Sequence, residues 1–150
     1  MDEMSAYKRI LAAVDGSPTS NKGLREALRL AKREGARLFV VNVVNDFPAF
    51  AAIEGPAPFD LVPMLREGGK RILARAEATA RKAGVKPAML MREIVGGRAA
   101  DAIVREAKKQ RADVIVLGTH GRRGVRRMVM GSDAEQVVRT SPVPVLLVRA

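Results

Sequence analysis

The sequence predicts an α/β fold in which a parallel β-sheet carries helices on both of its faces. Short apolar segments alternate along the chain with segments whose apolar residues recur at helical spacing. The central apolar segments show no polar alternation, which is typical of parallel strands that are buried on both faces. The chain has 150 residues, a length that suits a single domain over residues 1–150.

The first predicted unit is a strand followed by a helix. Residues 10–14 form a short apolar run that predicts a buried strand. Ser17 is a suitable N-cap for the helix, because Pro18 then occupies the first helical position. Gly35 is expected to end this helix. The apolar face of the helix consists of Leu24, Ala27, Leu28 and Ala31.

The middle of the chain continues the alternation of strand and helix. Residues 38–44 are apolar and predict a second strand. Residues 45–58 form a loop rich in Pro, Ala and Gly, and a long helix follows over 60–83 until Gly84 ends it. Residues 89–95 predict a third strand, whose polar positions indicate the edge of a sheet.

The last part of the chain supplies two more strands. A turn at Gly96 and Gly97 leads into a helix that is expected to face inward with Ala99, Ile103 and Ala107. Residues 113–117 are continuously apolar and predict the fourth strand. A short helix over 133–139 precedes a fifth strand at 144–148.

Two residues that follow apolar strands are candidates for a shared ligand crevice. In open parallel sheets, ligands bind outside the carboxyl ends of the strands, where the strand order reverses. Asp15 follows the first strand and Gly118 follows the fourth. If these two strands are neighbours, both residues face one crevice. An aspartate after a strand also commonly closes a turn, so Asp15 has two candidate roles.

The glycine-rich segment after the fourth strand predicts an anion site. It has Gly118, then Gly121 after two residues, then Gly131 and Ser132 after nine more. Glycines let the backbone approach an anion closely, and the amides and dipole of a helix start favour phosphate. The alternative is a loop without ligand, in which Ser132 and Glu135 form a capping box. We favour phosphate because the glycines and the helix start converge after a buried strand.

Other motifs of nucleotide sites and of catalysis are absent from the sequence. The segment from Gly16 to Gly23 resembles a Walker A loop, but it lacks the glycine before the lysine and the Ser/Thr after the lysine. No G-x-G-x-x-G motif follows a strand. The chain has no cysteine, and its one histidine, His120, has no partners for a catalytic triad. We therefore expect no catalytic residue and no metal ligand, and we expect His120 to touch phosphate.

The charge of the chain suggests an anionic partner without identifying it. The formal net charge is +11, and one dense cluster consists of Arg122, Arg123, Arg126 and Arg127. Nucleic-acid sites usually add aromatic stacking, but aromatic residues make up 3% of the chain and none lies in the cluster. No apolar run approaches the roughly 20 residues that cross a bilayer, and the N-terminus has no secretory pattern. The expected location is the cytoplasm, with no membrane partner.

The chain resembles the universal stress proteins, in their ATP-binding subgroup. The motif G-x2-G-x9-G-[S/T] of that family is matched at Gly118, Gly121, Gly131 and Ser132. Residues 8–15, 39–43 and the C-terminal segment that begins at Gly131 are also similar to the family. The resemblance spans nearly the whole chain.

This resemblance implies a Rossmann-like open sheet of five parallel strands in the order 3-2-1-4-5. It implies ATP as ligand, with or without Mg²⁺, and a homodimer paired through the last strand, Val145 to Val148. It also implies that Asp15 lies beside the ribose and phosphates, that the backbone of Val43 reads adenine, and that the glycine loop holds the phosphates. The remaining residues implied to line the pocket are Ala13, Val14, Leu117, His120, Asp133 and Ala134.

One departure from the family concerns the helix start. Asp133 stands where the family often has an uncharged residue, and its carboxylate would repel a γ-phosphate unless it turned away or met Mg²⁺. The expected function is an ATP-binding stress-response protein in which ATP regulates conformation or the choice of an unidentified protein partner. Hydrolysis is expected to be slow at most, because no Walker lysine is present. The alternatives are a nucleotide-free interaction module and a basic nucleic-acid-binding protein.

Overall fold

Five parallel strands form one sheet in the order β3-β2-β1-β4-β5 in the computed structural model, which describes residues 4–46, 61–119 and 131–149. The predicted fold class and strand order are confirmed. The strands are β1 (Arg9–Ala13), β2 (Arg37–Asn45), β3 (Ala88–Ile94), β4 (Val114–Gly118) and β5 (Val145–Val148). The helices are α1 (Pro18–Glu34), α3 (Leu61–Lys82), α4 (Ala99–Lys109) and α5 (Ser132–Thr140). Most of the predicted loop 45–58 lies outside the described residues.

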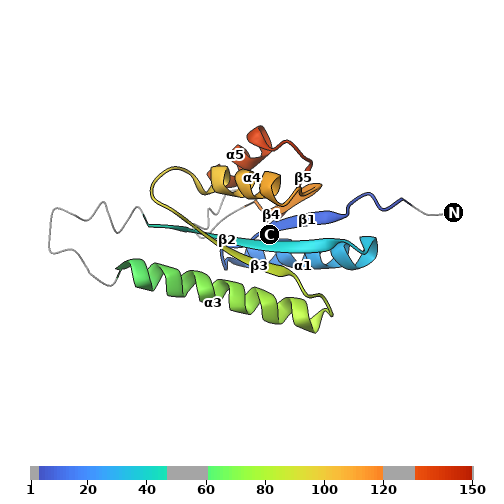
Figure 1. Ribbon diagram of the computed structural model, residues 1–150, viewed down its shortest axis with the longest axis horizontal. Helices are drawn as coiled ribbons and strands as arrows, with labels where there is room; N and C mark the ends of the chain where they lie inside the picture. The colour runs from blue at the N-terminus through green and yellow to red at the C-terminus, as the bar shows by residue number, and fades with distance from the viewer. Residues whose placement is uncertain (1–3, 47–60, 120–130, 150) are drawn as a thin grey trace.

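The sheet lies between two helical layers, with α1 and α3 on one face and α4 and α5 on the other (Figure 1). Successive residues of a strand point to opposite faces. Ile10 of β1 therefore packs in the core under α1 and α3, whereas Leu11 packs in the core under α4 and α5. β1 and β4 lie inside the sheet and are buried on both faces, as their apolar runs predict. Among the described helices, none is long and apolar enough to cross a bilayer.

The ends of α1 follow the predicted signals. The N-cap is Ser17, whose side chain accepts a hydrogen bond from the Ser20 N–H at 3.2 Å, and Pro18 opens the helix. Gly35 ends the helix in the left-handed region at φ 64°, a conformation that costs glycine little. These caps fix where the chain turns from β1 into α1, and this turn borders the candidate site.

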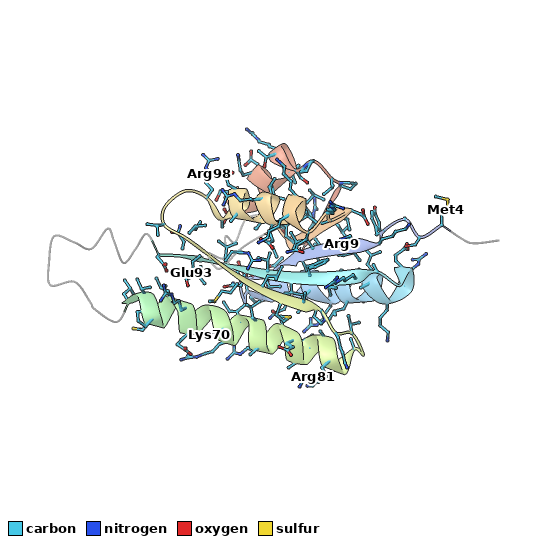
Figure 2. The ribbon with its side chains drawn as sticks, viewed as in Figure 1. Met4, Arg9, Lys70, Arg81, Glu93 and Arg98 are labelled. Carbon is cyan, nitrogen blue, oxygen red and sulfur yellow. The ribbon has the colours of Figure 1, made fainter. Side chains whose placement is uncertain are left out.

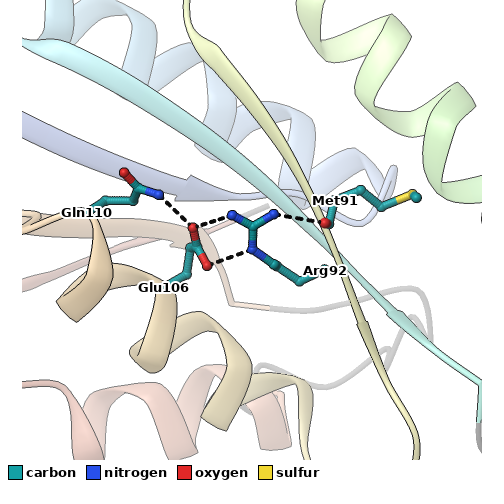
Figure 3. A network of polar contacts seen from close by, with 4 residues as sticks. All are labelled: Met91, Arg92, Glu106 and Gln110. Carbon is teal, nitrogen blue, oxygen red and sulfur yellow. Dashed lines mark hydrogen bonds and ion pairs between the residues drawn. The ribbon is translucent and has the colours of Figure 1, made fainter.

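The polar residues of β3 attach this edge strand to helices on both faces. Arg92 donates to both carboxylate oxygens of Glu106 on α4 at 2.8 Å, and Gln110 donates to the same carboxylate at 2.8 Å (Figure 3). On the other face, Glu93 pairs with Arg66 of α3 at 2.7 Å. Burial raises the pKa of Glu106, but the hydrogen bonds from Arg92 and Gln110 outweigh burial and hold this pKa below its ordinary value. The prediction that this strand is an edge is confirmed.

Candidate functional site

The carboxyl ends of β1 and β4 lie side by side, which is the condition for one crevice shared by Asp15 and Gly118. The two strands are parallel and paired, with Ile10 beside Val114 and Ala12 beside Val116. Because parallel strands end at the same edge of a sheet, the segments that follow β1 and β4 emerge next to each other.

Asp15 closes the turn between β1 and α1. Its Oδ1 accepts a hydrogen bond from the Ser17 N–H at 2.9 Å, and its own N–H donates to Ser20 Oγ at 2.9 Å. This is the turn-closing role expected of an aspartate after a strand. The side chain is half-buried, and the role predicted for it beside a ribose remains a prediction.

Four of the five apolar residues predicted to line the site lie on the face of the sheet that carries α4 and α5. Leu117 and Ala134 belong to the core cluster on that face, and Ala13 and Val43 pack against it. Val14 is buried directly after β1, and its N–H donates to a carbonyl of β2 at 2.9 Å. Ala13, Val43, Leu117 and Ala134 are therefore neighbours through one shared core, whereas Val14 packs in the core under α1 and α3 on the opposite face.

Gly118 has a packing role of its own. A Cβ atom at this position would lie 2.8 Å from the carbonyl carbon of Thr19 in the first turn of α1, closer than real Cβ atoms approach backbone. Gly23 allows a similar approach from the helix side, because its Cβ would lie 3.3 Å from the Gly118 nitrogen. The end of β4 is thus in direct contact with α1. His120, Gly121 and the arginine cluster at 122–127 lie outside the described residues.

The start of α5 is attached to the end of β4 by the Gly131 N–H, which donates to the carbonyl of Thr119. The N-cap of α5 is Gly131, with φ −60° and ψ 151°, and no described side chain caps the helix. The alternative of a capping box between Ser132 and Glu135 is therefore wrong. Ser132 is already the first helical residue, and the Glu135 carboxylate pairs with Arg139 at 2.8 Å.

Thr119 is a residue that the motif spacing did not single out. Its side chain is only 7% exposed, and its Oγ1 has no hydrogen-bond partner within the described residues. A buried hydroxyl without a partner costs about 1–3 kcal/mol, so a polar ligand atom nearby would be favourable. In the sequence, Thr119 occupies one of the unspecified positions between Gly118 and Gly121.

A hollow of about 320 Å³ lies at the start of α5. Two of the predicted site residues, Ser132 and Asp133, line it, and both side chains are exposed. Arg98 also lines it from the connection between β3 and α4, at the start of α4 (Figure 2). The turn at Gly96 and Gly97 marks the position of Arg98 in the sequence. No local pattern indicates that Arg98 lies near α5. The remaining lining residues are Glu135, Gln136 and Arg139.

A pair of carboxyl groups lies where β2 and β3 end. Asp46 follows β2 and is 4% exposed, and its Oδ1 has no hydrogen-bond partner within the described residues. Burial, a hydrogen bond with Glu93 and the charge of Glu93 raise the pKa of Asp46. The hydrogen bond from Arg66 lowers the pKa of Glu93. Asp46 is therefore the member of the pair that keeps a proton more readily. In the described ranges, no group of three His, Cys, Asp or Glu side chains could hold a metal ion.

Comparison with known proteins identifies the family. Residues 6–149 match the model of the universal stress protein family. A universal stress protein of Methanocaldococcus jannaschii is 34% identical over 144 residues, covering 95% of this chain and 82% of that protein. The structure of a universal stress protein from Archaeoglobus fulgidus in complex with dAMP has a TM-score of 0.70 and 26% identity, covering 95% of this chain and 98% of the other. A universal stress protein in complex with cAMP has a TM-score of 0.69 and 27% identity, covering 96% and 98% of the two chains. These matches confirm the resemblance found in the sequence, and the chain belongs to the universal stress protein family.

Proposed function

We propose that this chain binds ATP, with or without Mg²⁺, at the edge of the sheet where β1 and β4 end. The observation that carries the proposal is the bond between Gly131 and Thr119, which holds the start of α5 beside the end of β4. The first-turn amides of a helix lack intrahelical partners and favour phosphate, so this junction suits an anion. The Thr119 hydroxyl, which has no hydrogen-bond partner within the described residues, fits a polar ligand at the same junction. The two relatives solved with dAMP and cAMP support an adenine nucleotide as the ligand class.

In this proposal the nucleotide extends from β2 to α5. The backbone of Val43 meets the adenine, and Asp15 lies beside the ribose and phosphates. Asp15 faces the nucleotide with the carboxylate oxygen that accepts no hydrogen bond from the Ser17 N–H. The phosphates are held by the glycine motif, and apolar side chains of the shared core form the wall. The full set of proposed binding residues is Ala13, Val14, Asp15, Val43, Leu117, Gly118, His120, Gly121, Gly131, Ser132, Asp133 and Ala134.

We propose a regulatory role for the bound nucleotide. ATP would stabilise one conformation and so select protein partners during stress, and hydrolysis would be slow at most. The chain would act in the cytoplasm, as a single domain over residues 1–150. A homodimer through β5 would complete the assembly: β5 is a sheet edge, and its Leu146 is 41% exposed.

Release of bound nucleotide and thermal unfolding test the proposal. The protein purified without added nucleotide is denatured, and the supernatant is examined for adenine nucleotides. At an ATP concentration of 100 times Kd, binding adds about 2.7 kcal/mol to stability. For a chain of this size, we expect this to raise Tm by about 5–10 °C. If no nucleotide is released and millimolar ATP with Mg²⁺ leaves Tm unchanged, the nucleotide-free interaction module is the better explanation.

The position of the site is tested by Gly131→Val. The φ of −60° at Gly131 is accessible to every residue, so valine imposes no backbone strain there. Its side chain would obstruct phosphate at the helix start, and we expect a folded variant that has lost most of its ATP affinity. Unchanged ATP affinity would show that the phosphates bind elsewhere. Titration of random DNA at several salt concentrations tests the third alternative, since binding that does not respond to salt excludes a phosphate-backbone interface.

A further inference from the structure

Arg98 is poorly suited to the local structure that it occupies. It is the N-cap of α4, yet its side chain makes no capping hydrogen bond, whereas Ser, Thr, Asp or Asn would. Its positive charge also lies at the positive end of the helix dipole, where cations are unfavourable. Local rules are broken most often at functional positions, which directs attention to what the side chain meets.

The turn before Arg98 fixes its position relative to α5. Gly96 and Gly97 both have positive φ, 73° and 75°, a backbone conformation that favours glycine. The Gly96 N–H donates to Asn45 Oδ1 at 3.3 Å, which attaches the turn to the end of β2. From this turn, Arg98 lines the hollow at the start of α5 together with Ser132 and Asp133.

Within that hollow, Arg98 is the cation whose charge is not already compensated by a described neighbour. Arg139 also lines it, but its guanidinium pairs with Glu135 at 2.8 Å. Arg98 and Asp133 form no ion pair with any described residue. The hollow thus combines a helix start, the guanidinium of Arg98 and two carboxylates, of which Glu135 is paired with Arg139 and Asp133 forms no ion pair with a described residue. The end of β4 adjoins the same helix start, because the Thr119 carbonyl accepts a hydrogen bond from the Gly131 N–H.

We infer that Arg98 determines specificity by binding the terminal phosphate of a nucleoside di- or triphosphate. This inference rests on the proposed nucleotide site. The hollow, with a volume of about 320 Å³, is large enough to admit a phosphate group. Arg98 offsets the repulsion between Asp133 and a terminal phosphate, because a guanidinium can donate two parallel hydrogen bonds to phosphate oxygens. A monophosphate is too short to gain from this contact.

Affinities of the full chain for ATP, ADP and AMP, measured by calorimetry at fixed Mg²⁺ and salt, test the inference. In Arg98→Ala, we expect ATP affinity to fall about tenfold or more, since charge-assisted bonds to phosphate are strong. AMP affinity stays within about twofold of the parent value, because the lost contact is to the terminal phosphate. Arg98→Lys keeps the charge but not the paired donors, so part of the ATP affinity returns.

Two controls separate this role from a structural one. Arg105→Ala removes an exposed arginine of α4 that lines a different hollow, and it should leave the preference for ATP over AMP intact. Arg98→Ala should leave the Tm of the nucleotide-free protein unchanged or raised, since an unfavourable charge is removed. If Arg98→Ala loses affinity for ATP and AMP equally, or loses affinity for neither, the inference is overturned and the proposed nucleotide site is unaffected. A parent protein that binds neither nucleotide would overturn the proposed function itself.

Discussion

Two adjacent glycines of α3 should respond oppositely to alanine. Gly68 and Gly69 both lie inside the helix, where replacing glycine by alanine gains about 0.5–1 kcal/mol of helix propensity. A Cβ at Gly68 would have no atom within 4 Å, so Gly68→Ala should stabilise the protein by about that amount. A Cβ at Gly69 would lie 2.7 Å from Val44 Cγ2 and 2.9 Å from Asn42 Oδ1.

The neighbours of Gly69 have little room to move. Val44 is 5% exposed, and the Asn42 amide donates to the Val14 carbonyl at 2.8 Å. Inserting a methyl group into such a core costs about 1–3 kcal/mol, which exceeds the gain in propensity. Gly69→Ala should therefore be about 1–3 kcal/mol less stable than Gly68→Ala. Because Asn42 holds Val14 at the proposed site, Gly69→Ala should also weaken ATP binding.

Urea unfolding of the two variants and the parent measures this difference. For a chain of this size, each kcal/mol corresponds to about 2–4 °C in Tm, so thermal unfolding gives a second measurement. The m-values should agree among the three proteins, since a change in m would indicate an altered unfolded state. Equal stabilities of the two variants would refute the close contact of α3 with β2.

Four further predictions concern the charged groups and the junction of α1 with β4. Arg92→Ala should cost about 3 kcal/mol and more than Glu106→Gln, because it leaves a buried carboxylate without its cation; urea unfolding would show the order. The pKa of Glu106 lies below its ordinary 4.5, so the ionised carboxylate stabilises the fold above pH 4.5. This stabilisation is lost as pH falls through the lowered pKa, and the loss of stability in acid should be smaller in Glu106→Gln. The pKa of Asp46 is raised above 3.8, so ionisation of this carboxyl destabilises the fold as pH rises through the raised pKa. The stability of Asp46→Asn relative to the parent should therefore increase with pH. A difference in stability that does not change with pH would contradict this prediction. Gly118→Ala should cost about 1–3 kcal/mol by overlap with the backbone of Thr19, and a variant as stable as the parent would disprove that contact.

The elements of the fold were predictable because each is encoded in a local pattern. The apolar run at 10–14 and the cap signals at Ser17 and Gly35 act over a few residues, and the structure has them as predicted. At the start of α5 a local pattern allowed an alternative that the structure excludes. Ser132 followed by Glu135 matches a capping box, but the helix begins at Ser132 and Glu135 binds Arg139. A side-chain partner one turn away can compete with the cap, and the sequence pattern does not reveal which partner is preferred.

By itself, the sequence determined the alternation of strands and helices, the edge character of β3 and the family resemblance. Periodicity, end signals and motif spacing can be recognised within short segments of the chain. Only the tertiary structure decided which distant groups meet. Arg98 lines a hollow with Ser132, Arg92 binds Glu106, and the missing side chain of Gly118 admits the backbone of Thr19. Each contact joins elements that the packing of helices on the sheet brings together. A local pattern specifies which face of an element is apolar, but the partner of that face depends on how the whole chain closes its core.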